Sequence, residues 1–421
     1  MLKSISIHHF RSLDNVEIDL SNINIFVGNN ASGKTNVIDA IRLVRDSISN
    51  GLDRAIGDRH GIESVRQWSP TRPFRLSMTL NLDEGEKFKG KYQFSIDSAR
   101  GEIRVFHEDA EIYEQSDIFA EDDDEDESNN KTELQILHSK KVFKRNQKGK
   151  IEITEWNYLA SPEDEPFNPS IFFESPSLYG SKPEVRSLTF PQPDELYLGS
   201  RSPWQFGSLR SRLANFQAYS IFPNTLRMPQ DPSNETFLAP EGRNLASVFK
   251  RMRRSSRGVE ALNQITEAMQ AIMPNLERIS ILSLGGYLVP QFHIIEPSGK
   301  KHVFNVSQLS DGSLRVLGLL TALYQVPRPS IIALEEPEQT VNPGVLTVLA
   351  DSIKEVSRRS QILVTTHSPN LLDEFPPEAV KTVEYVGGRT TVDNVSANQM
   401  HIVRDRLFTL GELLVSEGLH G

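Results

Sequence analysis

The chain has 421 residues, of which 38% are hydrophobic and 24% charged, so it is long enough to form about two or three lobes. It contains no cysteine, which excludes disulfides, thiolate metal sites and thiol catalysis. Its net charge of -10 means that any DNA contact requires a local basic patch. The N-terminus lacks a signal-like apolar run and no membrane-length run follows, so we expect an unexported, cytoplasmic protein.

The first residues predict a β-layer that leads into a phosphate-binding loop. Apolar residues alternate around Ile5 and again from Val16 to Leu20, with the short basic turn at Arg11 between them. An apolar strand at residues 23–27 then feeds a Gly-rich turn, and residues 36–44 have the apolar period of a helix. Strand, glycine turn and helix in this order are the context that a phosphate-binding loop requires.

The turn itself fits the Walker A pattern G-x-x-x-x-G-K-[ST]. Its glycines let backbone N–H groups wrap the phosphates of ATP, and the dipole of the next helix favours the same anions. Lys34 is expected to reach the β- and γ-phosphate oxygens, and the Thr35 hydroxyl to ligate Mg²⁺. A glycine turn that binds nothing is the plain alternative. The predicted nucleotide-binding residues of this loop are Gly28, Asn29, Asn30, Ala31, Ser32, Gly33, Lys34, Thr35 and Asn36.

The middle of the chain predicts an inserted arm. Alternating apolar residues at 74–82 and 92–96 indicate a half-buried antiparallel sheet. Residues 121–127 are all Asp or Glu and have no apolar side chain to bury, so they form a loop tip, and six Lys or Arg residues follow within 140–150. This polarised insertion is either a solvated hairpin or an arm that contacts a partner or DNA.

Residues 190–240 show little period, and we expect irregular structure with short helices there. Residues 244–273 are helical, and they carry the basic run 250–254, continued by Arg257. That run is either a solvated helix face or a phosphate-contacting patch. Strand-like segments resume at 279–284, 287–295 and 302–306.

The C-terminal third carries three further motifs. The apolar strand at 331–334 ends in Glu335-Glu336-Pro337-Glu338, where Glu335 is expected to hold the metal and Glu336 to orient and deprotonate the attacking water. Ser310-Asp311-Gly312 precedes a helix at 314–324, where Ser310 or Asp311 is expected to cap the helix, and its place upstream of the carboxylate strand predicts a second phosphate-binding element. His367 follows the strand at 362–364, at the edge where ligands of open α/β sheets bind, within expected reach of a γ-phosphate.

Together these motifs resemble the ABC-type ATPase head of the RecF/SMC superfamily, in the compact OLD-like "AAA family ATPase" branch of the AAA_15 and AAA_21 kind. The resemblance covers residues 1–80 and 275–421. It implies that Ser310 to Gly312 are the signature motif, Glu335 and Glu336 the Walker B pair, residues 339–343 the D-loop, and His367 the switch histidine. It also implies a Q-loop glutamine near the metal at Gln67 and a phosphate-approaching arginine at Arg11. The expected catalytic residues are Glu336, His367 and Lys34.

The sequence departs from the family pattern in three respects. Glu335 stands where the family usually has Asp, and Asn342 where the compact branch commonly has His. The long stretch between the motifs lacks the heptads of SMC arms, and the residues after His367 are too few for the TOPRIM nuclease of OLD proteins.

The expected fold class is α/β: a P-loop NTPase, ABC-type ATPase head with an antiparallel β-subdomain and an inserted helical or irregular lobe. Residues 1–80 and 276–421 are expected to form the two halves of the head, and residues 81–275 the insertion.

The leading functional hypothesis is a Mg²⁺-dependent ATPase that dimerises around ATP and switches a partner. By family analogy it would be the regulatory subunit of an antiviral system with a separate nuclease or toxin. The alternatives are a RecF-like DNA clamp, a non-catalytic scaffold stabilised by ATP and, more remotely, a P-loop kinase or GTPase.

Overall fold

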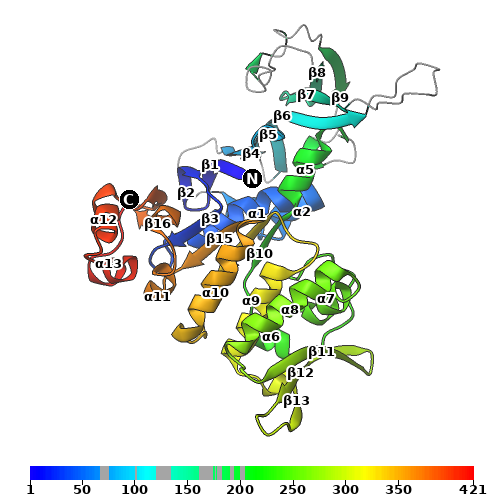
Figure 1. Ribbon diagram of the computed structural model, residues 1–421. Helices are drawn as coiled ribbons and strands as arrows, with labels where there is room; N and C mark the ends of the chain where they lie inside the picture. The colour runs from blue at the N-terminus through cyan, green and yellow to red at the C-terminus, as the bar shows by residue number, and fades with distance from the viewer. Residues whose placement is uncertain are drawn as a thin grey trace, which may run out of the picture. The chain divides into compact units, whose positions relative to one another are not determined.

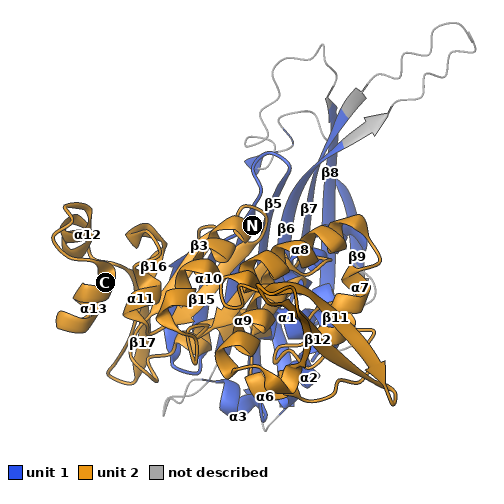
Figure 2. Ribbon diagram, turned by 60° about the horizontal axis from the view of Figure 1, so that its bottom comes forward, with its two compact units in different colours: residues 1–19, 43–214 blue, residues 20–42, 215–421 orange. Residues whose placement is uncertain are grey.

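The computed structural model describes residues 1–66, 75–99, 102–119, 134–160, 174–175, 177, 183–189, 194–199 and 204–421. Gln67 and the acidic segment 121–127 lie outside the described residues. The chain divides into two compact units, shown in Figure 2: unit 1 is Met1–Asp19 with Leu43–Ala214, and unit 2 is Leu20–Arg42 with Asn215–Gly421. This division differs from the three expected segments, because residues 1–19 belong with the arm's sheet and residues 215–275 with the C-terminal part.

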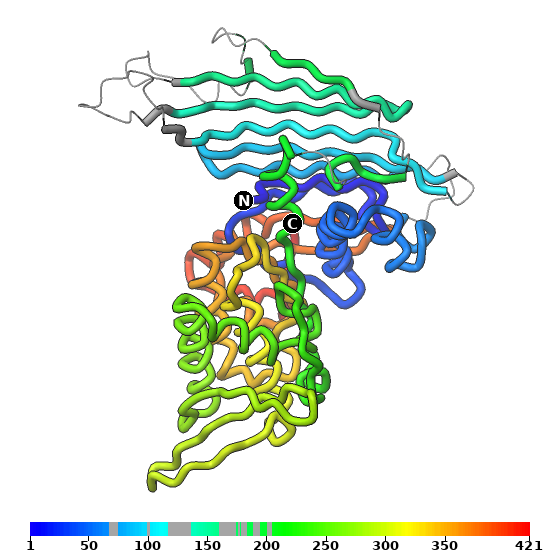
Figure 3. The backbone as a smooth tube through the Cα atoms, turned by 90° about the vertical axis from the view of Figure 1, so that its right-hand side faces the viewer, coloured from blue at the N-terminus to red at the C-terminus, as the bar shows by residue number. Residues whose placement is uncertain are grey.

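Unit 1 is built on an eight-stranded sheet in the order β2-β1-β4-β5-β6-β7-β8-β9, counted over the described residues. Every neighbouring pair is antiparallel, and Figure 3 shows the strands side by side, nearly in chain order. The strands are β1 Leu2–Phe10, β2 Leu13–Asp19, β4 Arg75–Asp83, β5 Phe88–Ala99, β6 Glu102–Phe119, β7 Leu134–Arg145, β8 Lys150–Ala160 and β9 Glu184–Thr189. The antiparallel sheet predicted from the alternation is therefore present.

The alternation in β4 shows why these residues form a sheet. Leu76, Met78, Leu80 and Leu82 are buried, while the residues between them are partly exposed. Successive side chains of a strand point to opposite faces, so one face of β4 is apolar and packs. The helical pieces of unit 1 are α2 Leu52–Gly57, α3 Ile62–Val65, η2 Tyr197–Gly199, η3 Trp204–Phe206 and α5 Gly207–Ala214.

The cations of the predicted basic hairpin pair within the sheet. Lys140 lies 2.7 Å from Glu111, and Lys141 lies 3.0 Å from Glu114 on the neighbouring strand. Arg145 is buried and contacts the fully buried Glu108 at 3.5 Å. These contacts favour a hairpin whose cations balance the glutamates of β6.

Unit 2 contains a six-stranded sheet in the order β10-β14-β15-β3-β16-β17 among the described residues (Figure 1). The first five strands are parallel and β17 is antiparallel to β16. The strands are β3 Ile23–Val27, β10 Phe216–Tyr219, β14 Ile331–Glu335, β15 Gln361–Thr366, β16 Val380–Val386 and β17 Arg389–Asn394. A mostly parallel sheet with helices on it is the α/β class that the sequence predicts.

β10 falls inside the segment that was expected to be irregular, so that expectation is wrong at residues 216–219. Four residues are too few to show a period, and this strand forms because it pairs in parallel with the apolar β14.

Buried helices cover the parallel sheet. α9 Asp311–Tyr324 is buried at every position from Ser313 onward, which reflects the apolar run of its sequence. It packs with α8 Ser256–Gln270 and α10 Pro343–Val356. The remaining helices are α1 Lys34–Asn50, which begins in unit 2 and continues into unit 1, α6 Pro223–Arg227, α7 Leu245–Met252, η4 Val306–Gln308, α11 Pro369–Leu372, η5 Pro377–Ala379, α12 Ala397–Arg404 and α13 Leu410–Ser416.

A three-stranded antiparallel sheet of β11 Leu276–Leu284, β12 Tyr287–Ile295 and β13 Lys301–Asn305 confirms the strands predicted there. Two arginines of the basic run on and after α7 bond to backbone carbonyls: Arg251 to Glu235 and Thr236, and Arg253 to Ile279. Part of that run is therefore structural. Within the described residues, no helix is both long and apolar enough to cross a membrane.

Candidate functional site

The loop between β3 and α1 has the backbone that the Walker A pattern predicts. Gly33 has a φ of 107° and Ala31 a φ of 63°, both in the left-handed region. A Cβ on Gly28 would lie 2.1 Å from the carbonyl oxygen of Val383, so only glycine fits there. The 17-residue helix α1 starts directly at Lys34, and its dipole favours an anion at this end.

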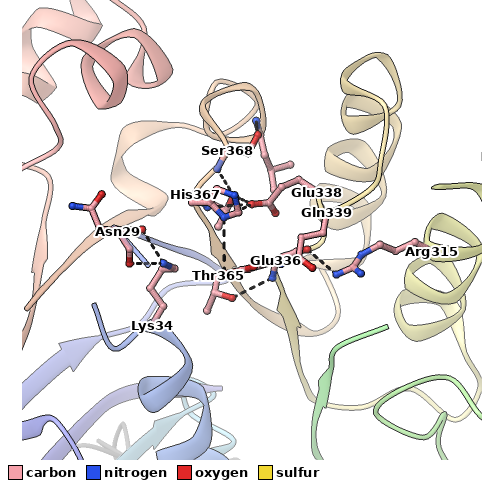
Figure 4. Close-up of polar contacts among 12 residues, drawn as sticks. Asn29, Lys34, Arg315, Glu336, Glu338, Gln339, Thr365, His367 and Ser368 are labelled. Atoms are coloured by element: carbon pink, nitrogen blue, oxygen red, sulfur yellow. Dashed lines mark hydrogen bonds and ion pairs between the residues drawn. The ribbon is translucent and has the colours of Figure 1, made fainter. Parts of the chain in front are cut away.

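Lys34 is folded back over this loop. Its Nζ donates to the carbonyl oxygens of Gly28 at 2.8 Å and Asn29 at 2.9 Å (Figure 4). Burial lowers the pKa of Lys34, while the nearby carboxylates of Glu336 and Glu338 raise it. The lysine of one motif therefore lies within the field of the carboxylates of another.

Thr390 on β17 fixes the loop from the side, and sequence reasoning missed it. Its Oγ1 donates to the carbonyl oxygen of Ser32 at 2.7 Å, and a Cβ on Gly33 would lie 2.3 Å from this hydroxyl. The Ser32 hydroxyl is buried and has no hydrogen-bond partner among the described residues. No motif surrounds Thr390, so the sequence offers no signal for this contact.

Glu336 stands at the carboxyl end of β14 in a constrained conformation. Its φ is 43°, and its N–H donates to both the carbonyl oxygen (2.9 Å) and the Oγ1 (3.2 Å) of Thr365. Its carboxylate accepts a hydrogen bond from Gln339, and Oε1 lies 3.9 Å from His367 Nδ1. The structure thus brings together Lys34, Glu336 and His367, which the sequence singled out separately (Figure 4).

Glu338, to which the sequence argument gave no role, is a buried carboxylate of this site. Its Oε1 accepts from the Thr366 hydroxyl at 2.7 Å and from the His367 N–H at 3.1 Å, and it lies 3.5 Å from His367 Nδ1. Its Oε2 is buried without a partner among the described residues. The Glu-Glu-Pro-Glu run was the available signal, because a third carboxylate so near the strand end must also lie near the site.

Glu335, the expected metal ligand, is paired with a guanidinium. Arg42 on α1 contacts its Oε1 at 2.7 Å, and the two side chains are 25% and 13% exposed. Thr35 is exposed at the start of the same helix. No group of three or more His, Asp or Glu residues with metal-site geometry occurs within the described part of the chain.

Of the two caps that the sequence allows, Ser310 and Asp311, the structure has Ser310, whose hydroxyl accepts from the N–H of Ser313 at 3.2 Å. Asp311 is held by Arg227 at 2.5 Å, and Arg227 also donates to the carbonyl oxygen of Leu309. A Cβ on Gly312 would lie 2.8 Å from the carbonyl oxygen of Thr340, so the turn after the Walker B strand packs against the helix start.

Arg315 connects the signature helix to the Walker B strand. It is buried, and its Nη2 donates to the carbonyl oxygen of Glu336 at 2.9 Å. Burial lowers the pKa of Arg315, while Glu338 and Glu336 raise it. This hydrogen bond links α9 to the backbone of Glu336.

The roles of two further predicted site residues, Arg11 and Gln67, stay predictions. Arg11 belongs to unit 1, in the turn between β1 and β2, where its N–H bonds to the carbonyl oxygen of Val65. Its approach to the phosphates stays a prediction, as does the role of Gln67, which lies outside the described residues.

The chain is similar in part to curated DNA replication and repair proteins RecF. It is 33% identical to that of Clostridium perfringens over 107 residues, which are 24% of this chain and 27% of the relative. Identity to the RecF of Streptococcus agalactiae is 49% over 41 residues, 10% of this chain and 11% of the relative. The match thus spans about a quarter or less of these relatives.

Solved SMC heads align over most of the chain. One is an SmcHead bound to the C-winged helix domain of ScpA, with a TM-score of 0.49, 14% identity and coverage of 95% of this chain and 99% of that one. Another is the SMC head domain from Thermotoga maritima, with a TM-score of 0.41, 13% identity and coverage of 94% and 99%.

The profile of a family described as "AAA domain, putative AbiEii toxin, Type IV TA system" matches residues 23–373, which contain the residues predicted to form the Walker A loop, the signature motif and the Walker B strand, together with His367. This match confirms the expected AAA family branch. The chain belongs to this family, AAA_21, of P-loop ATPases.

Proposed function

We propose that this protein binds and hydrolyses ATP with Mg²⁺, and that two copies close around two ATP molecules to switch a partner. One observation carries the proposal: Lys34, Glu336 and His367 come from three separate motifs and meet at the carboxyl edge of one parallel sheet. That edge is where open α/β sheets bind ligands.

The residues at this edge fit the two groups that the family implies. The loop leads into the positive dipole end of α1, and the buried Ser32 hydroxyl lacks a partner among the described residues, both suited to phosphate oxygens. Thr35 and Glu335 supply the oxygen ligands that Mg²⁺ prefers, and Mg²⁺ commonly takes only one or two from the protein. When bound, the ion neutralises charge on the β- and γ-phosphate oxygens.

The side chains then have separate tasks. When ATP binds, the Lys34 ammonium group breaks its hydrogen bonds to the carbonyl oxygens of Gly28 and Asn29. It then pairs with phosphate oxygens and neutralises their negative charge. Glu336 accepts a proton from the attacking water, and His367 orients the γ-phosphate. Glu335 can ligate Mg²⁺ once its ion pair with Arg42 breaks, so this ion pair sets the free-energy cost of forming the metal site.

Dimerisation supplies the second half of each site. Ser310 and the N–H groups at the start of α9 form a second phosphate-binding element, which we assign to the ATP held by the other copy. Arg315 would transmit its engagement to the backbone of Glu336 in the same copy. ATP binding by one copy and readiness for hydrolysis in the other are then linked.

For the biological role we propose the regulatory ATPase of a bacterial antiviral system, acting with a separate nuclease or toxin. The family description, which names a toxin–antitoxin system, supports this assignment. A RecF-like DNA clamp is the second candidate, favoured by the partial match to RecF. The net charge of -10 argues against it.

The test compares the mass and ATP turnover of the wild type, Glu336→Gln and Glu336→Gln/Ser310→Arg. Glu336→Gln keeps the size of the side chain but cannot accept a proton, so it should accumulate as an ATP-dependent dimer with turnover reduced at least about 100-fold. Adding Ser310→Arg should return it to the nucleotide-free mass. The matched control is Glu378→Gln, an exposed glutamate outside the site.

Wild-type turnover by Glu336→Gln would remove Glu336 from the catalytic role, and an ATP-independent mass would refute the clamp. Binding of duplex DNA that weakens steeply with salt and requires ATP would favour the DNA-clamp candidate.

A further inference from the structure

A cavity of unit 2 lies away from the motifs described above. It has a volume of about 590 Å³ and is lined by the first turns of α8, the end of α9 with residues 326–328, and the end of α10 with residues 358–359 (Figure 1). The segments at the ends of α9 and α10 precede the amino ends of β14 and β15, whereas Glu336 and His367 follow the carboxyl ends of these strands. At about 3.3 Å per residue, a five-residue strand such as β14 separates the two edges by about 16 Å.

Four arginines line this cavity: Arg257, Arg328, Arg358 and Arg359. We call it the arginine pocket. Among the described residues, none of the four has a carboxylate within ion-pair distance, and the Nε of Arg328 is buried without a hydrogen-bond partner. Burial and the neighbouring charge of Arg359 lower the pKa of Arg328. Positively charged guanidinium groups therefore lie near one another in the pocket, and a bound anion would reduce the repulsion between them.

The carboxylates of the pocket offset the charge of these arginines only in part, because burial and Arg359 lower the pKa of Arg328 more than Glu355 raises it. Both oxygens of Glu355 are engaged by other donors: Oε2 accepts from the Tyr324 hydroxyl at 2.6 Å and Oε1 from Gln264 Nε2 at 3.0 Å. Glu260 lies on the exposed side of α8. The guanidinium N–H groups therefore remain available to donate hydrogen bonds to a bound ligand.

Neutralisation of helix ends is the plain alternative, because α9 and α10 both end at the pocket with their negative dipole ends. Two such ends amount to about one negative charge. Four guanidinium groups exceed this charge even when Glu260 and Glu355 are added. The pocket therefore keeps a positive surplus.

The wall also includes apolar and aromatic residues, among them Tyr324, Val326 and Pro327. A cavity of this volume suits a small molecule, and the planar fork of arginine matches phosphate oxygens in pairs. A ligand with phosphate groups and a flat apolar part uses both kinds of wall. We propose that the arginine pocket binds a small phosphorylated ligand of the nucleotide class, at a site separate from the Walker A loop.

Calorimetric titration with ATP, inorganic tripolyphosphate and adenosine tests this proposal in Lys34→Ala protein, where the Walker A loop no longer competes. ATP and tripolyphosphate should bind with one site per chain, and adenosine alone should not. Arg358→Gln/Arg359→Gln should weaken both phosphate compounds at least about tenfold. Both arginines are exposed, so the change leaves no buried cavity.

The matched control is Lys87→Gln/Lys300→Gln, which removes the same charge from exposed positions outside the pocket and should bind as the parent does. Should Lys34→Ala fail to fold, the wild type should bind two ATP molecules per chain and the Arg358→Gln/Arg359→Gln variant one. Equal affinities in pocket and control variants would overturn the proposal. So would absence of phosphate binding, or tighter binding of a glutamate hexapeptide than of either phosphate compound.

Discussion

Replacing Glu338 by alanine tests whether this buried carboxylate holds the end of β15 in place. The substitution leaves the Thr366 hydroxyl, which is fully buried, and the His367 N–H without their acceptor. A buried donor left unsatisfied costs roughly 1–3 kcal/mol. Water can reach the half-exposed His367, and loss of a buried charge offsets part of the cost, so we expect a loss of about 2–4 kcal/mol.

Amide hydrogen exchange of β15, measured by mass spectrometry on nucleotide-free protein, is the appropriate assay. A loss of about 2 kcal/mol should accelerate exchange there about 30-fold. Tryptophan fluorescence should not report the change, because the described tryptophans, Trp156 and Trp204, both belong to unit 1.

Glu338→Gln keeps an acceptor oxygen for both donors and should exchange within a few-fold of the wild type. Glu378→Ala, at an exposed carboxylate, is the matched control. If Glu338→Ala leaves the exchange of residues 361–366 unchanged within threefold, the carboxylate does not hold this strand end and the reasoning fails.

Lys34→Ala should weaken ATP binding at the Walker A loop by at least about 100-fold, since it removes the cation for the β- and γ-phosphates; unchanged affinity in a competition assay with labelled ATP would exclude this role. His367→Ala should bind ATP with unchanged affinity and hydrolyse it at least about tenfold more slowly, whereas equal loss of both would make the histidine structural. In unit 1, burial lowers the pKa of His138 to about 4, and its Nδ1 lies 2.6 Å from the Tyr113 hydroxyl. Between about pH 6.5 and 4, His138 therefore binds a proton in the unfolded chain but not in the folded one. The free energy of unfolding should accordingly fall as the pH drops through this window. Urea midpoints followed by tryptophan fluorescence should fall less between pH 7 and pH 5 in His138→Gln, and an equal fall would contradict this origin.

The sequence alone determined the features that depend on neighbouring residues. The Walker A loop, the cap at Ser310 and the apolar strands 23–27, 331–334 and 362–364 follow from glycine conformations, side-chain hydrogen bonds and periodicity within a few residues. Because parallel strands end at one edge, even the meeting of Lys34, Glu336 and His367 followed from local patterns once the sheet was assumed.

Only the tertiary structure decided which side chains complete or restrain the site. Arg42 pairs with Glu335 across 293 positions and Thr390 with Ser32 across 358, and no period or motif links such distant residues. The four-residue β10 and the arginine pocket likewise depend on segments that chain folding brings together. The partner of a charged or hydroxyl side chain is set by packing in three dimensions, so its role could be read only from the fold.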